Sequence, residues 1–148
     1  SSGYAGAEAL RDTIQRDLGL RVEVVNVEWS DYVDGLVRRQ YPAYELYWGA
    51  DYPDPESLLL VLFGAGRADN YVDYANERFD AVLAAAAGEQ DPAKRLELYR
   101  SAQQILLDDH VVIPLYFDVS YTLAKPWVKG LAVTPLGILS LERVWLEH

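Results

Sequence analysis

The sequence of 148 residues contains no cysteine, which excludes disulfides, thiolate chemistry and cysteine-ligated zinc or iron–sulfur sites. It contains only two histidines, so a Ser-His-Asp triad or a two-histidine metal site is hardly possible. Basic residues are also scarce: the chain has 13 basic and 23 acidic residues, which gives a net charge of −10. Nucleic acid and anionic membranes both require a basic surface. We therefore expect no nucleic-acid partner, and no catalytic residue, metal or cofactor stands out.

Long apolar runs and targeting segments are missing as well. No run approaches the ~20 apolar residues of a membrane span. The first ten residues lack the basic start and apolar centre of a signal peptide. The closing residues 146–148, Leu-Glu-His, are typical of the start of a polyhistidine expression tag. The remaining composition, 51% hydrophobic and 24% charged, is typical of one globular domain with a core.

The apolar periodicity predicts alternating helices and strands. Helical spacing over residues 5–18 ends at Gly19, and period-two alternation then predicts a strand over 21–27. Further helices are expected behind caps at Ser30 and Asp31, over 56–63, behind Asn76, and behind Asp91 with Pro92 at its first position. Further strands are expected at 44–48, 111–117, 120–124 and 139–145. This alternation predicts an α/β fold with a mainly parallel sheet flanked by helices.

Residues 48–55, Trp-Gly-Ala-Asp-Tyr-Pro-Asp-Pro, join an expected strand to an expected helix. Asp54 is followed by Pro55 and Glu56, so it has the form of a helix N-cap with proline at the first helical position. A different structural role is expected for His110, which follows a helix end and interacts there with the helix dipole.

Asp51 stands too early to cap the same helix and lies just past the carboxyl end of the expected strand. In open α/β sheets ligands bind in the crevice outside those strand ends. Trp48 and Tyr52 would add aromatic walls, and an acid beside aromatic rings suits an ammonium group. The alternative is a turn aspartate that bonds its own backbone. The residues alone leave both roles open.

Several segments in collinear order resemble the C-terminal part of the family-5 bacterial solute-binding proteins, the oligopeptide-, dipeptide- and nickel-binding components of ABC importers. The most specific are the Trp-x-Ala-Asp-Tyr-x-x-Pro element at 48–55 and the Lys-Pro-Trp-Val turn at 125–128. The resemblance covers nearly the whole chain. It implies a truncated α/β lobe of the periplasmic-binding-protein type, extracytoplasmic, from a protein whose two lobes close on a ligand and deliver it to a membrane permease.

The resemblance also implies a division of the chain and a set of site residues. Residues 1–117 would belong to the C-terminal lobe, and 118–145 to a segment that returns through the hinge to the other lobe. In oligopeptide-binding members the aspartate matching Asp51 pairs with the α-ammonium of the peptide. The tryptophan matching Trp48 lines the cleft, and Ala50 and Tyr52 match around them. Gly49 departs from the cysteine of the best-known oligopeptide binders, which leaves the peptide preference open.

The sequence also leaves two other functions possible, and it predicts how the apolar residues of the last segment pack. Asp51 and Asp54 are the acid–base pair that a small acidic hydrolase would use. The chain is also compatible with a protein-interaction domain that pairs through its terminal apolar strands. Without the rest of the protein, apolar residues of the last segment lose their partners, so they are expected to pack on this domain's own sheet or against a second copy of the chain. These residues are Tyr121, Leu123, Trp127, Leu139, Leu141, Val144 and Trp145.

Overall fold

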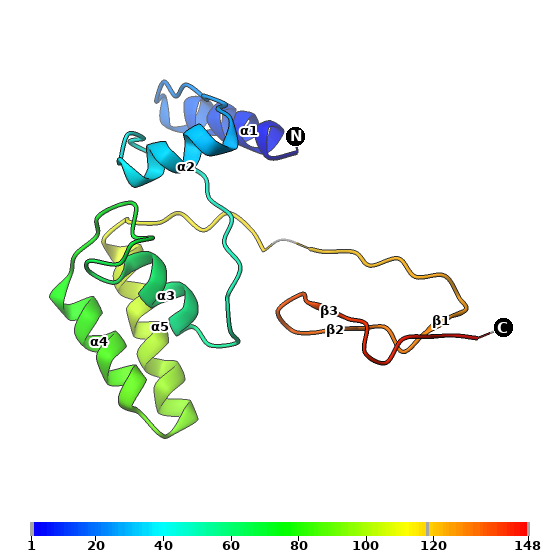
Figure 1. Cartoon of the computed structure of the whole chain (residues 1–148). Helices are drawn as coiled ribbons and strands as arrows, with labels where there is room; N and C mark the ends of the chain where they lie inside the picture. Colours follow the sequence, from blue (N-terminus) through cyan, green and yellow to red (C-terminus); the bar gives the residue numbers. More distant parts are fainter. Residues whose placement is uncertain (1, 118, 148) are drawn as a thin grey trace. The chain divides into compact units, whose positions relative to one another are not determined.

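The computed structural model describes residues 2–117 and 119–147, which divide into two units at residue 47 (Figure 1). His148, part of the expected tag, and residue 118, the first of the expected hinge segment, lie outside the described residues. The elements are α1 (Ser2–Leu18), α2 (Trp29–Val37), α3 (Glu56–Phe63), α4 (Glu77–Gly88), α5 (Pro92–Asp108), β1 (Val128–Lys129), β2 (Ala132–Val133), β3 (Leu139–Ser140) and β4 (Trp145–Leu146). None of the described helices combines the length and the apolar character needed to cross a membrane.

The first unit contains α1 and α2. The sequence correctly places the end of α1, because Gly19 follows it with φ of 67° and donates its N–H to the carbonyl of Gln15. The expected capping of α2 by Ser30 and Asp31 is wrong. The helix begins at Trp29, so both residues lie inside its first turn, and the residue before it forms no side-chain cap bond.

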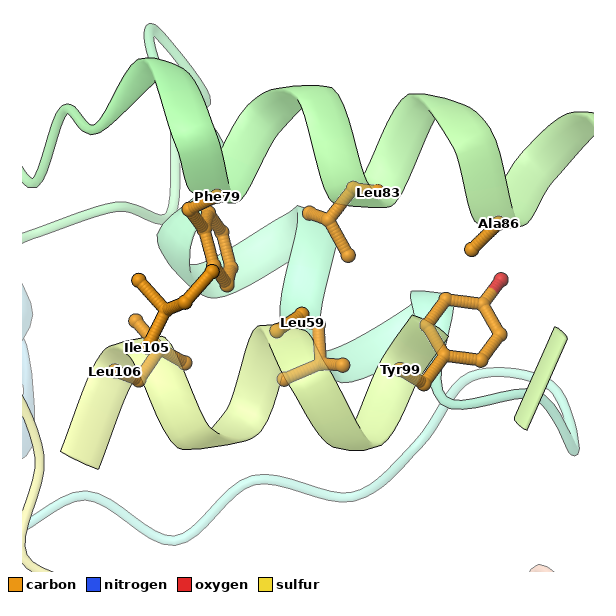
Figure 2. Close-up of a cluster of buried hydrophobic side chains, with 8 residues drawn as sticks. Leu59, Phe79, Leu83, Ala86, Tyr99, Ile105 and Leu106 are labelled. Carbon is orange, nitrogen blue, oxygen red and sulfur yellow. The ribbon is translucent and has the colours of Figure 1, made fainter. Parts of the chain in front are cut away.

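The second unit is built around a hydrophobic core that α3, α4 and α5 enclose (Figure 2). Helices α4 and α5 pack along each other, and α3 packs against both. The buried residues of this core are Leu59, Phe79, Leu83, Ala86, Tyr99, Ala102, Ile105 and Leu106. The periodicity of α5 predicts an apolar face of Leu96, Tyr99, Ala102, Gln103 and Leu106, but Leu96 and Gln103 are exposed and Ile105 is buried instead. The core stripe of α5 therefore starts one turn later than the periodicity indicated.

Side-chain caps fix the start of both long helices, as predicted. The Asn76 side chain accepts hydrogen bonds from two backbone amides of the first turn of α4. The Asp91 side chain does the same for α5, with Pro92 at the first helical position. These caps satisfy amides that have no partner inside the helix.

The strands expected before residue 128 do not form within the described residues. The segments 21–27, 44–48, 111–117 and 120–124 carry no ladder of backbone hydrogen bonds. A helix closes its hydrogen bonds within one segment, whereas a strand requires a neighbouring strand. These segments have strand-like composition, but no neighbour in the described parts of this chain provides the other half of a ladder.

The only paired strands of the described residues form a hairpin at the C-terminal end of the chain. Strand β2 pairs with β3 and β1 pairs with β4, both antiparallel, so strand character is confirmed at both ends of the expected 139–145 strand. A turn over 141–144 separates β3 from β4. Gly130 has φ of 74° and lies against the carbonyl of Arg143, where a Cβ would collide.

Candidate ligand-binding site

The candidate site is the loop over residues 48–55, which leads into α3. The backbone N–H of Asp51 donates to Ser57 Oγ at 2.8 Å, and Ser57 is 0% exposed within α3. The Asp51 residue itself is exposed, and its carboxylate forms no hydrogen bond or ion pair with the described residues. The alternative role for Asp51 was that of a turn aspartate whose side chain bonds its own backbone. The described residues show no such bond. The loop holds the backbone of Asp51 and leaves its charge unpaired.

Asp54 lies at the start of α3, as the sequence predicts, but Pro55 and not Asp54 occupies the N-cap. Its Oδ1 accepts the backbone N–H of Glu56 at 2.9 Å, and its backbone carbonyl accepts the N–H of Ser57 at 3.1 Å. Helix α3 starts at Glu56 with Pro55 at the cap position, one residue later than predicted. The other carboxylate oxygen, Oδ2, lies 2.6 Å from Nη1 of Arg95. With both oxygens engaged, Asp54 is unsuited to the acid–base pair of a hydrolase.

The same loop contains the other predicted site residues, Trp48, Ala50 and Tyr52. Trp48 and Ala50 are half-buried. The indole Nε1 of Trp48 is buried without a hydrogen-bond partner among the described residues, a state that costs about 1–3 kcal/mol. The hydroxyl of Tyr52 donates to Glu56 Oε2 at 3.3 Å. Burial, followed by the Glu56 carboxylate, raises the pKa of Tyr52, which keeps its hydroxyl protonated and able to donate.

Arg95 on α5 is a residue of this region that the sequence does not reveal. Besides Asp54, its guanidinium binds the hydroxyl of Tyr99 through Nη2 at 2.7 Å and the carbonyl of Ala86 through Nε at 3.1 Å. Burial, followed by the Asp54 carboxylate, raises the pKa of Tyr99. The one available signal is that Arg95 precedes Tyr99 by four residues, which puts both on one helix face. The sequence gives no sign that Asp54 reaches the same face.

The described residues contain no group of three or more His, Cys, Asp or Glu side chains that could hold a metal ion. A cavity of about 230 Å³ lies where the loop meets α5, lined by Asp54, Pro55, Pro92, Arg95, Leu96 and Tyr99. The Asp54–Arg95 pair forms one wall of this cavity, which is consistent with the partial exposure of both side chains.

No family model matches the chain, but individual proteins do. It is 32% identical to the periplasmic oligopeptide-binding protein OppA of Escherichia coli over 116 residues, which are 78% of this chain and 21% of OppA. It is 29% identical to the dipeptide-binding protein DppE of Bacillus subtilis over 92% of this chain and 25% of DppE. The solved structure of the murein tripeptide binding protein MppA of Escherichia coli matches 84% of this chain with a TM-score of 0.73 and 31% identity. The chain belongs to the family-5 solute-binding proteins.

Membership in the solute-binding proteins decides two of the open expectations. The relatives named above are binding proteins and not enzymes, which supports a non-enzyme over the hydrolase alternative, in agreement with the engaged oxygens of Asp54. The α/β fold class is confirmed by the likeness to solved binding proteins, although the chain itself is rich in helices and pairs few strands. The chain spans about a quarter of the length of these relatives.

Proposed function

We propose that this chain forms one wall of a ligand cleft in an extracytoplasmic solute-binding protein that delivers oligopeptides or dipeptides to an ABC permease. The names of the relatives support this, since OppA, DppE and MppA are an oligopeptide-, a dipeptide- and a murein tripeptide-binding protein. OppA and MppA are also periplasmic by name, which supports the location. The remaining three quarters of such a protein would supply the second wall.

The observation that carries the proposal is the unpaired carboxylate of Asp51 on a loop whose backbone is held by Ser57. The free α-ammonium of a peptide forms short, charge-assisted hydrogen bonds with a carboxylate. Trp48 and Tyr52 add aromatic surface beside it, which also attracts a cation.

The test is the substitution Asp51→Asn in the full-length protein, measured by calorimetric titration with a tripeptide and its N-acetylated form. The amide keeps the shape of the side chain but removes its charge. Hydrogen bonds to charged groups contribute about 1.5–3 kcal/mol, so we expect the affinity for the free tripeptide to fall at least about tenfold. The N-acetylated tripeptide has no ammonium group, so its weaker binding should change little.

The matched control is Asp31→Asn, the same change at an exposed residue in the first turn of α2. It should leave the affinity for both peptides unchanged. An equal loss for the free and the acetylated tripeptide in Asp51→Asn would contradict the ammonium role. Failure of the unsubstituted full-length protein to bind any short peptide would contradict the proposed function as a whole.

For the isolated 148-residue chain we propose, in addition, self-association through the apolar residues that follow α5. Tyr121 and Leu123 are 87% and 98% exposed, and Trp145 in β4 is exposed as well. Exposed apolar patches of this kind mark interaction surfaces or aggregation sites. In the full-length protein the same surfaces would be covered by the rest of the chain.

A further inference from the structure

Arg95 connects three separate parts of the second unit through one guanidinium group. Its Nη1 pairs with the loop residue Asp54, its Nη2 donates to Tyr99 on α5, and its Nε donates to the carbonyl of Ala86 in the last turn of α4. Figure 2 shows Ala86 and Tyr99 facing each other between the two helices. The Ala86 carbonyl also accepts the backbone N–H of Glu89 at 3.3 Å, so the bond from Arg95 ties the guanidinium to the C-terminal cap of α4. The position of the guanidinium is therefore fixed by the packed helices.

The loop receives a second fixed point from α3. Ser57 Oγ accepts the N–H of Asp51, while Asp54 donates its own N–H to the carbonyl of Tyr52 at 2.8 Å. The four residues 51–54 are thus held at their start by Ser57 and at their end by Arg95. Of the polar side chains of residues 51–54, Tyr52 and Asp54 have partners among the described residues and the carboxylate of Asp51 has none.

We propose that Arg95 is a positioning residue for ligand binding, which acts through Asp54 to hold the Asp51 carboxylate where the ammonium group of a peptide is bound. The inference rests on the proposed function, because it assigns Arg95 to the site of Asp51. A loop held in its bound geometry before the ligand arrives loses less conformational entropy on binding, and the affinity rises accordingly.

The partial exposure of the pair distinguishes this role from simple stabilisation. The side chains of Arg95 and Asp54 are 32% and 21% exposed, so solvent screens much of their attraction. Removing the charge of Arg95 should therefore lower the unfolding temperature only a little. The loop, in contrast, loses one of its two fixed points. Binding of a ligand that needs Asp51 should respond more strongly than folding.

The experiment uses the full-length protein with the variants Arg95→Gln, Arg95→Lys, Asp51→Asn and the double variant Asp51→Asn/Arg95→Gln. Each is titrated with a tripeptide and its N-acetylated form, and its unfolding temperature is recorded. We expect Arg95→Gln to lower the affinity for the free tripeptide about tenfold, within the range of coupling for residues in one hydrogen-bonded network. Binding of the acetylated form should be unchanged. Arg95→Lys keeps the charge but loses the fork of donors, so its loss should be smaller.

The double variant tests whether Arg95 acts through Asp51. If it does, the double variant binds the free tripeptide no more weakly than Asp51→Asn alone, because the acid that Arg95 positions is already neutral. The control is Arg100→Gln, on the same helix, where the arginine pairs with Glu97 at the surface and does not contact the loop. It should leave both affinities unchanged.

The outcomes separate this inference from the proposed function. The positioning role would be overturned if Arg95→Gln lowered the affinity for both peptides equally, or if the two losses of affinity added up in the double variant. The proposed function would still stand in that case, provided that Asp51→Asn lowered the affinity for the free tripeptide alone. A non-selective loss in Asp51→Asn would overturn both. If Arg95→Gln proves unfolded, Arg95→Lys decides in its place, because a loss confined to the free tripeptide supports the role and an equal loss refutes it.

Discussion

Asp109, the residue that follows α5, shows how one side chain can tie distant parts of the second unit together. Its Oδ2 accepts a hydrogen bond from the hydroxyl of Tyr74 at 2.6 Å and another from the side-chain amide of Asn76 at 2.7 Å. These two bonds join the end of α5 to the loop before α4. They favour the ionised carboxylate, so first Tyr74 and then Asn76 lower the pKa of Asp109. Burial, followed by the bond to Asp109, raises the pKa of Tyr74 to about 12.

The lowered pKa predicts a dependence of stability on pH. In the unfolded chain Asp109 titrates near its ordinary value of about 3.9. The folded state binds fewer protons in the range below that value, so the stabilisation is complete above pH ~4 and is lost as the pH falls through the folded pKa. In Tyr74→Phe the pKa of Asp109 should rise back toward its ordinary value, as measured by NMR titration of its carboxyl carbon. The loss of stability in acid should then be smaller.

The control Tyr116→Phe, at an exposed tyrosine away from these bonds, should not change the pKa of Asp109. An unchanged Asp109 pKa in Tyr74→Phe would show that the hydroxyl does not hold the carboxylate.

At the scale of elements, the sequence predicts the helices well because a helix is specified by local residues. The caps Asn76 and Asp91 and the terminal Gly19 all act within a few residues of the turn they define. The segment 21–27 has the composition of a strand, yet it pairs with nothing in the described residues, because its partner must come from elsewhere in the chain or beyond it.

The same contrast applies to the candidate site. The helix start next to Asp54 could be predicted from its neighbour Pro55 to within one residue, since both belong to one turn. Arg95 could not, because it reaches Asp54 from a helix that is distant in sequence, and only the packing of α3 and α5 brings the two together. Asp51 could be singled out by its place after a strand-like segment, although its role in binding stays a prediction.

The end of α5 offers a prediction on the stability of a single element. His110 follows the helix in a left-handed conformation with φ of 57°, while its N–H and that of Val111 donate back to the carbonyls of Leu107 and Leu106. Its ring Nδ1 also lies 3.0 Å from the Leu107 carbonyl, in line with the expected role at the helix end. This geometry favours glycine. His110→Gly should therefore raise the free energy of unfolding by about 0.5–1 kcal/mol, measured by urea denaturation of the isolated chain at low concentration.

The variant His110→Ala provides the comparison for this prediction. It keeps a Cβ in the left-handed conformation but loses the contact of the ring with Leu107. We expect it to be no more stable than the unsubstituted chain. If His110→Gly were also no more stable, the ring contact would outweigh the backbone strain at this position.

At the scale of the whole molecule, the chain contains a complete helical core and incomplete strands. The helices α3, α4 and α5 bury their apolar faces against one another, which explains why this part forms from the chain's own residues. Residues 113–117 and 120–124, which follow α5, are different, because their apolar side chains face solvent and their backbone has no ladder. The chain spans about a quarter of the length of its relatives, and we expect the neighbours of such strands in the part of a relative that this chain does not cover.

Open strands of this kind predict the self-association of the isolated chain. Unpaired backbone groups and exposed apolar side chains form a template for pairing with a second copy. Phe117 is 99% exposed and Leu123 is 98% exposed, with Tyr121 between them. In size-exclusion chromatography with light scattering, the mass should exceed the 16.7 kDa of one chain and rise with concentration. The double variant Tyr121→Ser/Leu123→Ser should shift the mass toward that of a monomer, because it removes apolar surface from the segment that pairs. Leu18→Ser, at an exposed leucine at the end of α1, is the control and should leave the mass unchanged. A monomeric chain whose NMR signals show residues 119–124 to be disordered would refute this prediction, because the segment would then remain unpaired in solution.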